Sequence, residues 1–304
     1  MVIVNWNAGS SLRECVDSVA ACSAGRVDTI VVVDNGSRDG SADELEGRPD
    51  VKVVRAGRNL GFGRACNLGA REAGSEYLLF LNPDAMLRPA TLPAVLAYMD
   101  GSAAGDVGIC GVQLLDANGR VARSCSRLPT TGRLLAQTVG IDRFVPRLGC
   151  FMSEWDHAET REVQQVIGAF YLVRRPLFAR LGGFDERFFV YFEEVDFALR
   201  AARAGWRSVY FTDAQAFHAG CGTTAQAKAR RLFYYQRSRW LYARKHLPTA
   251  GAGAVLALTL TAEPFARTVG GLARARWPEV REAWGAWSKL LSWLGRGSPV
   301  GVDE

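Results

Sequence analysis

Short apolar runs alternate with helical patterns through the first half of the chain. The runs span residues 2–4, 29–34, 51–55 and 77–84. The apolar residues after the first run recur at the spacing of one helix face, and Ser10 or Ser11 is the expected N-cap of that helix. An Ala-rich helix is expected from about residue 63 to 73. Short buried strands separated by helices predict an open α/β sheet with right-handed crossovers.

The pattern changes in the second half of the chain. Periodicity fades from about residue 126 to 165, where we expect a long irregular segment. An apolar run over 166–173, a short helix from Pro176 and a strand near 208–212 follow. A basic, aromatic helix is expected over roughly 225–247.

Polar clusters follow three of the predicted strands, at residues 5–7, 34–40 and 82–84. In open α/β sheets, ligands bind beyond the carboxyl ends of the strands. The sequence therefore predicts a ligand site at this edge of the sheet.

Composition narrows the class of protein. The chain has 304 residues, of which 48% are apolar and 22% charged, which is typical of a globular protein and excludes disorder, collagen and coiled coil. The net charge is +6, and arginines are concentrated after residue 200. This bias either reflects genome base composition or indicates an anionic surface as partner, with nucleic acid or acidic lipid as the candidates.

Cysteine usage and hydropathy bear on the compartment. The seven cysteines include no CxxC pair, which favours a reducing compartment over a disulfide framework. Met1 opens directly into a strand-like run, so we expect no signal peptide. The longest apolar stretch, over 251–262, is too short to span a bilayer, which needs about 20 residues.

Two carboxylates follow predicted strands. Asp34 ends a buried strand and could accept a hydrogen bond from a nucleoside, or could simply form a turn. Asp84, in the run Asn82-Pro83-Asp84, is a good ligand for Mg²⁺ or Mn²⁺, which bind one or two carboxylates together with substrate phosphates. Its alternative role is to cap the strand.

A second acidic cluster follows four aromatic residues. Glu193, Glu194 and Asp196 lie near a predicted helix start, where the helix dipole favours acids. Asp196 could simply pair with Arg200 four residues later. Glu194 is a candidate general base, because a carboxylate beside aromatic rings has its pKa raised. His218 enters a glycine-rich loop and is either structural or a metal ligand.

Together these motifs resemble family 2 glycosyltransferases, in particular the bacterial rhamnosyltransferase-like branch. The matching segments, in the order of the family, are VIVNWN (2–7), VVDNGSRDGS (32–41), NLGFGRACNLG (59–69), LFLNPDA (79–85), IGAFYLVRR (167–175), GGFDERFFVYFEEVDFALR (182–200) and FHAGCGTT (217–224). The resemblance covers about residues 1–245. It implies a GT-A nucleotide-diphospho-sugar transferase fold, with a mixed, mostly parallel sheet flanked by helices and a C-terminal helical extension.

The resemblance also implies a domain organisation. Residues 1–224 would form the catalytic domain, with a donor half at about 1–112 and an acceptor half at about 113–224. Residues 225–304 would form a basic, aromatic helical extension.

The roles of individual residues are carried over from the family. Donor-binding residues would be Asn5, Asn7, Asp34, Asn59, Gly61, Phe62, Asn67, Asn82 and Asp84. Glu194 matches the general base and Asp196 the acid that follows it, while Glu193, Gly168 and Ala169 would contact the acceptor. Asp84 and His218 would hold the divalent cation, Mg²⁺ or Mn²⁺.

Two departures from the family pattern concern the chemistry. Asn82 replaces the first acid of the DxD motif, so the metal site has one carboxylate fewer. The base is Glu194 rather than the commoner Asp, which moves the carboxylate by one methylene.

The resemblance implies an inverting transfer, with rhamnose from dTDP-rhamnose as the leading donor and a glycan or polyprenyl-diphosphate-linked acceptor in cell-wall or surface polysaccharide synthesis. A UDP-sugar, galactofuranose or a hexose remains open, as does a non-catalytic nucleotide-sugar-binding protein. A nucleotidyltransferase would need a Gly-rich basic loop after the first strand, and a dehydrogenase would need GxGxxG, so both are disfavoured. Nucleic-acid binding, suggested by charge alone, is disfavoured as well.

The C-terminal region predicts a membrane partner. Residues 230–246 interleave arginines with aromatic residues, and the tail adds Trp277, Trp284, Trp287 and Trp293. A helix with an aromatic and a basic face lies in the headgroup region of a bilayer. We therefore expect a cytoplasmic enzyme peripherally associated with the anionic inner face of the plasma membrane. The alternative is that the 225–247 helix packs on the catalytic domain with its arginines solvated.

Overall fold

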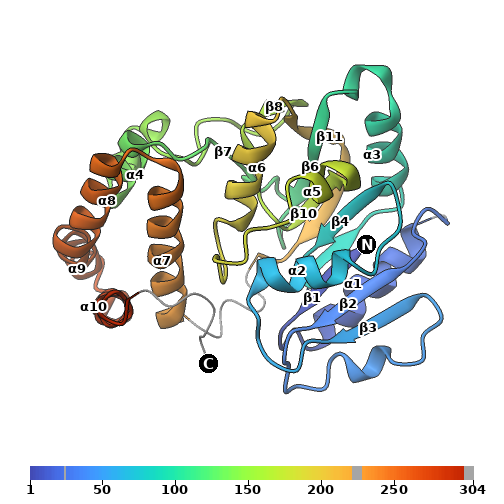
Figure 1. Ribbon diagram of the computed structural model, residues 1–304, viewed down its shortest axis with the longest axis horizontal. Coiled ribbons are helices and arrows are strands. Elements are labelled where there is room, and N and C mark those ends of the chain that lie inside the picture. Colours follow the sequence, from blue (N-terminus) through green and yellow to red (C-terminus); the bar gives the residue numbers. More distant parts are fainter. Residues whose placement is uncertain (24, 221–227, 298–304) are drawn as a thin grey trace.

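A sheet flanked by helices forms the centre of the computed structural model, which describes residues 1–23, 25–220 and 228–297 (Figure 1). The strands of the main sheet are β1 (Val2–Asn5), β2 (Ile30–Asp34), β3 (Val51–Arg55), β4 (Tyr77–Leu81), β5 (Ala85–Leu87), β6 (Val107–Leu115), β8 (Arg161–Val163), β10 (Phe170–Arg174) and β11 (Arg207–His218). A separate pair is formed by β7 (Cys125–Ser126) and β9 (Gln165–Val166). The helices of the sheet region are α1 (Ser10–Cys22), α2 (Phe62–Ala70), α3 (Thr91–Asp100), α5 (Arg175–Arg180) and α6 (Glu193–Arg203).

The order of the main sheet is β3-β2-β1-β4-β10-β6-β11-β5, with β8 beside β11. The pairs among β3, β2, β1 and β4 are parallel, as is the pair of β6 and β11. β10 lies antiparallel between β4 and β6. The expected mixed, mostly parallel sheet is therefore present. Because β10 runs antiparallel to β4, the start of β10 lies beside the end of β4.

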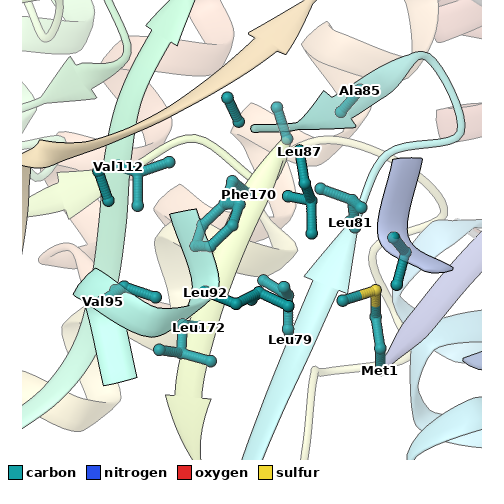
Figure 2. Close-up of a cluster of buried hydrophobic side chains, with 14 of the residues drawn as sticks. Met1, Leu79, Leu81, Ala85, Leu87, Leu92, Val95, Val112, Phe170 and Leu172 are labelled. Atoms are coloured by element: carbon teal, nitrogen blue, oxygen red, sulfur yellow. The ribbon is translucent and has the colours of Figure 1, made fainter. Parts of the chain in front are cut away.

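Two hydrophobic clusters cover the two faces of the sheet, because successive strand residues point to opposite sides. On one face, Leu79 and Leu81 of β4 pack with Leu92 and Val95 of α3 and with Phe170 of β10 (Figure 2). The other cluster contains the alternate residues of β4 and side chains of α2, α5 and α6. The helices thus hold the carboxyl ends of the strands in fixed positions.

The segment 126–165 is not irregular throughout, so this expectation is wrong. It contains α4 (Thr131–Val139), followed by the 3₁₀ turns η3 (Ile141–Arg143) and η4 (Pro146–Leu148). Thr130 caps α4 by accepting from the Arg133 amide at 3.3 Å, and Gly140 ends it in the left-handed conformation, at φ 78°. The expectation that Ser10 or Ser11 caps α1 is also wrong. Gly9 is at the N-cap position and makes no side-chain hydrogen bond.

Four helices follow the sheet region at the end of the molecule farthest from β3 (Figure 1). They are α7 (Lys228–His246), α8 (Thr249–Thr261), α9 (Glu263–Ala273) and α10 (Trp277–Gly295). Arg237 and Arg239 of α7 are 2% and 1% exposed, and Tyr242 packs on Phe192 before α6. α7 therefore packs on the catalytic domain, as in the alternative interpretation, but the expectation that its arginines are solvated is wrong for these two.

Two structural findings concern the membrane and the cysteines. Within residues 1–23, 25–220 and 228–297, no helix is both long and apolar enough to cross a bilayer. The six cysteines of the described chain are buried and form no disulfide.

Candidate functional site

The first part of the site lies where β1 and β2 end side by side. Asn5 and Asp34 are partners in the parallel register, so the loops that follow them start from the same edge. The Asn5 side chain is fully buried and donates to the hydroxyls of Ser41 at 2.8 Å and Ser37 at 3.1 Å. Asp34 accepts from the Ser37 amide at 3.1 Å and from Arg55 at 3.1 Å. These two side chains therefore fix the shape of the loop.

Asn7 continues this edge in an unusual backbone conformation. Its φ of 52° lies in the left-handed region, which Asn tolerates better than most residues. Its side-chain oxygen accepts from the Arg38 amide at 2.7 Å, which ties the loop after β1 to the loop after β2.

The loop before α2 forms the next wall. Asn59 accepts from the Gly61 amide at 2.9 Å and from Asn35 at 3.0 Å. Asn35, which sequence reasoning missed, also accepts from the Leu60 amide at 2.8 Å. A Cβ on Gly61 would collide with the backbone of Phe189, so this position requires glycine. The position of Asn35 beside Asp34 in the DNGS turn was the available signal.

Asn67 has a bracing role in the structure. Its amide group donates to the Phe184 carbonyl at 2.8 Å, and its oxygen accepts from the Phe184 amide at 2.9 Å. The side chain thus holds the turn 182–186 against α2, where it is buried. A contact between Asn67 and the donor remains a prediction.

A polar corner forms where β4, β5 and β11 meet. The β5–β11 register pairs Ala85 with His218. His218 therefore lies close to Asp84, the residue before Ala85. Nε2 of His218 lies 3.3 Å from Oδ1 of Asp84 and 3.2 Å from Nδ2 of Asn82. Both Asp84 and His218 side chains are mostly buried, at 11% and 14% exposed. The structure therefore brings together the residues predicted from the NPD run and from the later histidine.

The donor set of this corner fits a divalent cation that also binds substrate phosphates. One carboxylate oxygen and one imidazole nitrogen converge there, and Mg²⁺ takes only one or two protein carboxylates in phosphate-binding sites. Groups of three or more His, Cys, Asp or Glu side chains able to hold an ion are absent from the described residues. A diphosphate would therefore have to complete the coordination.

Gly168 and Ala169 connect this corner to the acidic helix. The Ala169 carbonyl accepts from the Asn82 amide at 3.0 Å. A Cβ on Gly168 would lie 3.8 Å from the ring of Phe62, and the Phe62 amide donates to the Phe189 carbonyl at 2.7 Å. These contacts link the end of β4, through the start of β10 and of α2, to the segment that leads into α6.

Glu193 and Glu194 form the first turn of α6. Glu193 is 4% exposed and lies against α2, where a Cβ on Gly63 would be 3.3 Å from its Cβ. Glu194 is less deeply buried than Glu193. One carboxylate oxygen of each has no hydrogen-bond partner among the described residues. Two adjacent buried carboxylates, each with one unpartnered oxygen in the described chain, are the strongest sign of a reacting group in this structure.

Burial raises the pKa of both glutamates. For Glu193, the Glu194 carboxylate adds to the effect of burial. For Glu194, backbone hydrogen bonds oppose burial, but the pKa remains raised. The same two carboxylates, after burial, raise the pKa of Cys66, and Glu194 raises that of Tyr171. The pair therefore lies between α2 and β10.

Backbone strain precedes the glutamates. Tyr191 and Phe192 have φ values of 67° and 72°, a conformation that bulky residues rarely adopt. Tyr235 of α7 packs on both rings, and Ser238 donates to the Val190 carbonyl at 2.8 Å. Strain of this kind is found at functional sites where the surrounding structure enforces it.

Asp196 is fully buried in an ionic network that links α6 to α7. It bonds to Arg200 at 2.7 Å, Lys245 at 2.5 Å and His246 at 2.6 Å. Burial would raise the pKa of Asp196, but His246, Arg200 and Lys245 outweigh it and lower that pKa. The predicted pairing with Arg200 is present. The carboxylate of Asp196 is thus fully paired, whereas Glu193 and Glu194 each keep one oxygen without a partner in the described chain.

Known proteins share sequence with most of this chain. The family model of Glycosyl transferase family 2 matches residues 1–182. An N-acetylglucosaminyl-diphospho-decaprenol L-rhamnosyltransferase from Mycobacterium tuberculosis is 31% identical over 257 residues, covering 80% of this chain and 82% of the relative. Rhamnosyltransferase WbbL from Escherichia coli is 29% identical over 173 residues, covering 54% of this chain and 61% of the relative.

Solved structures show the fold. A mannosyltransferase from Pyrobaculum calidifontis, in complex with GDP-Man and Mn²⁺, matches with a TM-score of 0.55 at 20% identity, covering 98% of this chain and 78% of that one. The protein TarS from S. aureus, in complex with UDP-GlcNAc, matches with a TM-score of 0.55 at 17% identity, covering 98% and 80%. The GT-A fold expected from the sequence is confirmed.

Proposed function

The chain belongs to glycosyl transferase family 2, and on that premise we propose that it is an inverting, metal-dependent rhamnosyltransferase. The donor is a deoxythymidine-diphosphate rhamnose, and the acceptor is a hydroxyl of a polyprenyl-diphosphate-linked sugar. The similarity to the mycobacterial enzyme, whose name states a rhamnose transfer to a decaprenol-linked sugar, supports this choice of substrates.

The observation that carries the mechanism is the Glu193–Glu194 pair at the start of α6. Glu194 is the more accessible of the two, and one of its oxygens has no partner within the described chain. A base must be within reach of the proton it accepts and must have a pKa suited to its task. Burial raises the pKa of Glu194 above that of an ordinary glutamate, which makes it a better proton acceptor.

The transfer needs one base and one means of neutralising the leaving group. Glu194 accepts the proton of the acceptor hydroxyl as its oxygen bonds to C1 of the sugar, and the bond from C1 to the nucleoside diphosphate breaks on the opposite face. The configuration at C1 is therefore inverted. Asp84 and His218 would hold a divalent cation, which supplies charge neutralisation at the departing diphosphate.

The remaining residues orient the two substrates. The loops after β1 and β2 offer polar groups around Asp34 for the nucleoside, held in place by Asn5 and the serines. The acceptor sugar lies beside Gly168, where a Cβ would meet only the ring of Phe62 within 4 Å. Asp196 fixes α6 and thereby the direction of Glu194.

A transfer assay with a matched variant tests this function. Purified protein is incubated with Mn²⁺, a panel of nucleotide sugars and a short-chain lipid-diphosphate sugar, and the product is examined for anomeric configuration. We expect transfer from the rhamnose donor with inversion. Glu194→Gln should bind the donor as before but lose roughly 10²–10⁴-fold in turnover.

Two results would contradict the proposal. Retention of configuration would exclude a single displacement. Full activity of Glu194→Gln together with an inactive Asp196→Asn would show that the base is Asp196 and not Glu194.

We also propose that the enzyme acts at the cytoplasmic face of the plasma membrane, since its acceptor is lipid-linked. The C-terminal helices supply basic and aromatic residues near that surface, with Trp277 64% exposed and Trp284 36% exposed. Trp293 is buried and contributes to packing instead.

A further inference from the structure

Exposed apolar side chains are concentrated at one end of the molecule. The structure describes 13 large hydrophobic side chains as exposed, and all but Val121 and Phe151 lie in residues 131–149 or 263–297. We call these two segments the helical end; they lie around α4, α9 and α10, farthest from β3 (Figure 1). Exposed apolar groups scattered singly are ordinary, but a concentration of them marks an interaction surface.

The loop after α4 contains the most exposed of these side chains. Phe144 is 87% exposed, and Ile141, Val145 and Leu148 are 47%, 47% and 48% exposed. None of the four belongs to a buried hydrophobic cluster of the described residues. The cost of exposing them to water is therefore not offset within the described chain.

Helix α9 adds an apolar stripe at the same end. Phe265, Val269 and Leu272 are 60%, 68% and 47% exposed, and their spacing of four and three residues places them on one face of the helix. This stripe and the loop come from segments more than a hundred residues apart in the chain. Their presence at one end of the molecule thus results from the fold and not from a local run of apolar sequence.

Charge identifies the partner. Residues 131–149 contain three arginines and one acid, and residues 263–297 contain six basic and three acidic residues. Arg143 and Arg147 are exposed and adjacent in sequence to Phe144 and Leu148. The core of a protein interface is depleted of charge, whereas a surface that lies in the headgroup region combines apolar and basic side chains.

A groove beside the loop extends the apolar surface inward. It has a volume of about 580 Å³ and lies between α4, η4 and Leu258 of α8. Leu135, Val139 and Leu148 line it, and Arg133 and Arg147 stand beside them. An apolar groove with neighbouring arginines suits a hydrocarbon chain that carries a phosphate.

We infer that the helical end is the membrane-docking surface of this enzyme, with the loop 141–148 inserted among the headgroups of an anionic bilayer. The inference rests on the proposed function, because a lipid-linked acceptor requires the enzyme to work at a bilayer. It adds the loop 141–148, which precedes the tryptophan-containing helix by more than a hundred residues, to the surface that contacts the bilayer.

Helix α4, which precedes the loop, is linked through Tyr235 to the residues around the proposed base. Gln137 of α4 accepts from the hydroxyl of Tyr235 at 3.0 Å, and the Tyr235 ring packs on Tyr191 and Phe192, directly before Glu193. The helix that carries the docking loop is therefore joined to the segment that leads into the proposed acceptor site.

Cosedimentation of the full-length protein with vesicles tests the inference. The vesicles are phosphatidylcholine with or without phosphatidylglycerol, and the variants are Val145→Asp and Phe144→Asp. The matched control is Val121→Asp, which places the same charge on an exposed valine outside the helical end. Both loop variants should lower the bound fraction about tenfold on anionic vesicles, since a carboxylate opposes apolar insertion and anionic lipid alike.

Several outcomes would overturn the inference. They are an absence of binding by the unchanged protein, equal binding by Val145→Asp, and an equal loss in Val121→Asp. A Val145→Asp protein that changes from dimer to monomer in sedimentation, with no vesicle binding before or after, would assign the surface to a second copy instead.

A second measurement separates this inference from the proposed function. Transfer to a water-soluble short-chain acceptor should be unchanged in Val145→Asp, because the loop contains none of the proposed catalytic residues. If the unchanged protein binds vesicles through the loop but transfers no sugar, the docking surface stands and the proposed function fails. If transfer occurs without vesicle binding, the docking surface fails alone.

Discussion

Two adjacent glutamates illustrate how burial, the largest cause of their raised pKa values, prepares a side chain for chemistry. Glu193 and Glu194 lie in the first turn of α6, where the helix dipole favours negative charge, yet burial raises the pKa of both. Burial is the larger effect because each carboxylate has an oxygen without a partner in the described chain. The two carboxylates therefore accept a proton readily, and holding them buried in the charged form lowers the stability of the folded protein.

This cost predicts a pH dependence of stability that Glu193→Gln should reduce, with Glu194 still contributing. A raised pKa in the folded state means that the folded protein binds the proton more tightly than the unfolded chain does. The stability contributed by Glu193 is thus present at low pH and is lost as the pH rises through its raised pKa. We expect the melting temperature of the unchanged protein to fall more steeply between pH 5 and pH 8 than that of Glu193→Gln.

Melting curves at a series of pH values check this prediction. Glu193→Gln should be the more stable protein at pH 8, because it removes the charge that is hard to bury. Parallel pH curves for the two proteins would show that the carboxylate is solvated or paired.

The polar corner at β4 and β11 predicts a metal dependence. His218→Ala leaves Asp84 as the only predicted metal ligand there, so the Mn²⁺ concentration for half-maximal activity should rise about tenfold or more, by analogy with the loss of one group from a metal shell. The measurement is activity against Mn²⁺ concentration. His218→Asn keeps a polar group at this position, so its Mn²⁺ requirement should rise less. His157→Ala is not a suitable control, because His157 is fully buried. An unchanged Mn²⁺ requirement in His218→Ala would remove the histidine from the metal site.

At the scale of elements, the junction of α6 and α7 couples the helical extension to the catalytic helix. Lys245 bonds to Asp196 and, at 2.7 Å, to Asp185 in the turn before α6. Arg200 also donates to the carbonyls of Leu181 and Gly183, at 2.7 and 2.8 Å. One network thus fixes the turn 182–186, α6 and the end of α7 together.

Asp196→Asn should therefore destabilise the protein strongly. Removing one member of a buried ionic network leaves the others unpaired, which costs about 3–5 kcal/mol. Asp50→Asn is the matched control: its ion pair with Arg48 is 37% and 28% exposed, and such surface pairs contribute about 0–1 kcal/mol. Chemical denaturation measures both.

The contribution of Asp196 to stability depends on pH with the opposite sign to that of Glu193. Because the pKa of Asp196 is lowered, its contribution is present at neutral pH and is lost as the pH falls. The deficit of Asp196→Asn should shrink on acidification. Equal stability of Asp196→Asn and the unchanged protein at pH 7 would show that the network has no net value.

The sequence predicted the elements whose pattern is local and repeated. The strands β1 to β4 and helix α7 were expected near their observed bounds, because apolar periodicity reports which residues face a core. Helix α4 was missed, since only Leu134 and Thr138 of its residues are buried and its signals are the cap residues Thr130 and Gly140. The burial of Arg237 and Arg239 was unpredictable from α7 alone, because it depends on Glu263 and on Trp293, which follow later in the chain.

The site shows the same limit. Resemblance identified the residues that meet at the strand ends, but it could not separate those that bind from those that brace. Asn67, predicted to bind the donor, and Asp196, predicted as the acid that follows the base, also hold a turn and a helix in place. That distinction depends on partners far away in the sequence, such as Phe184 and Lys245.

At the scale of the whole molecule, α10 is part of the protein's packing and not a detachable tail. Ala286, Leu290 and Trp293 are buried, and they cluster with Phe233 of α7. The guanidinium of Arg237 lies over the Trp293 ring, 5.2 Å from its centre. Removing α10 would therefore expose the apolar side of α7, the helix whose other contacts hold α6.

Truncation before Trp277 should accordingly lower the melting temperature and cause aggregation, since burying a side chain such as Leu290 contributes roughly 1.5–3 kcal/mol. Trp277→Ser is the matched control, because that side chain is 64% exposed and its loss should shift stability by about 0.5 kcal/mol at most. Thermal melts and light scattering of the two proteins make the comparison. If the truncated protein melts like the unchanged one, α10 is not needed for the fold, and deletion becomes a valid probe of membrane binding. If it melts lower, loss of vesicle binding on truncation carries no information about lipid contact, and substitutions in the loop 141–148 are the sound way to measure it.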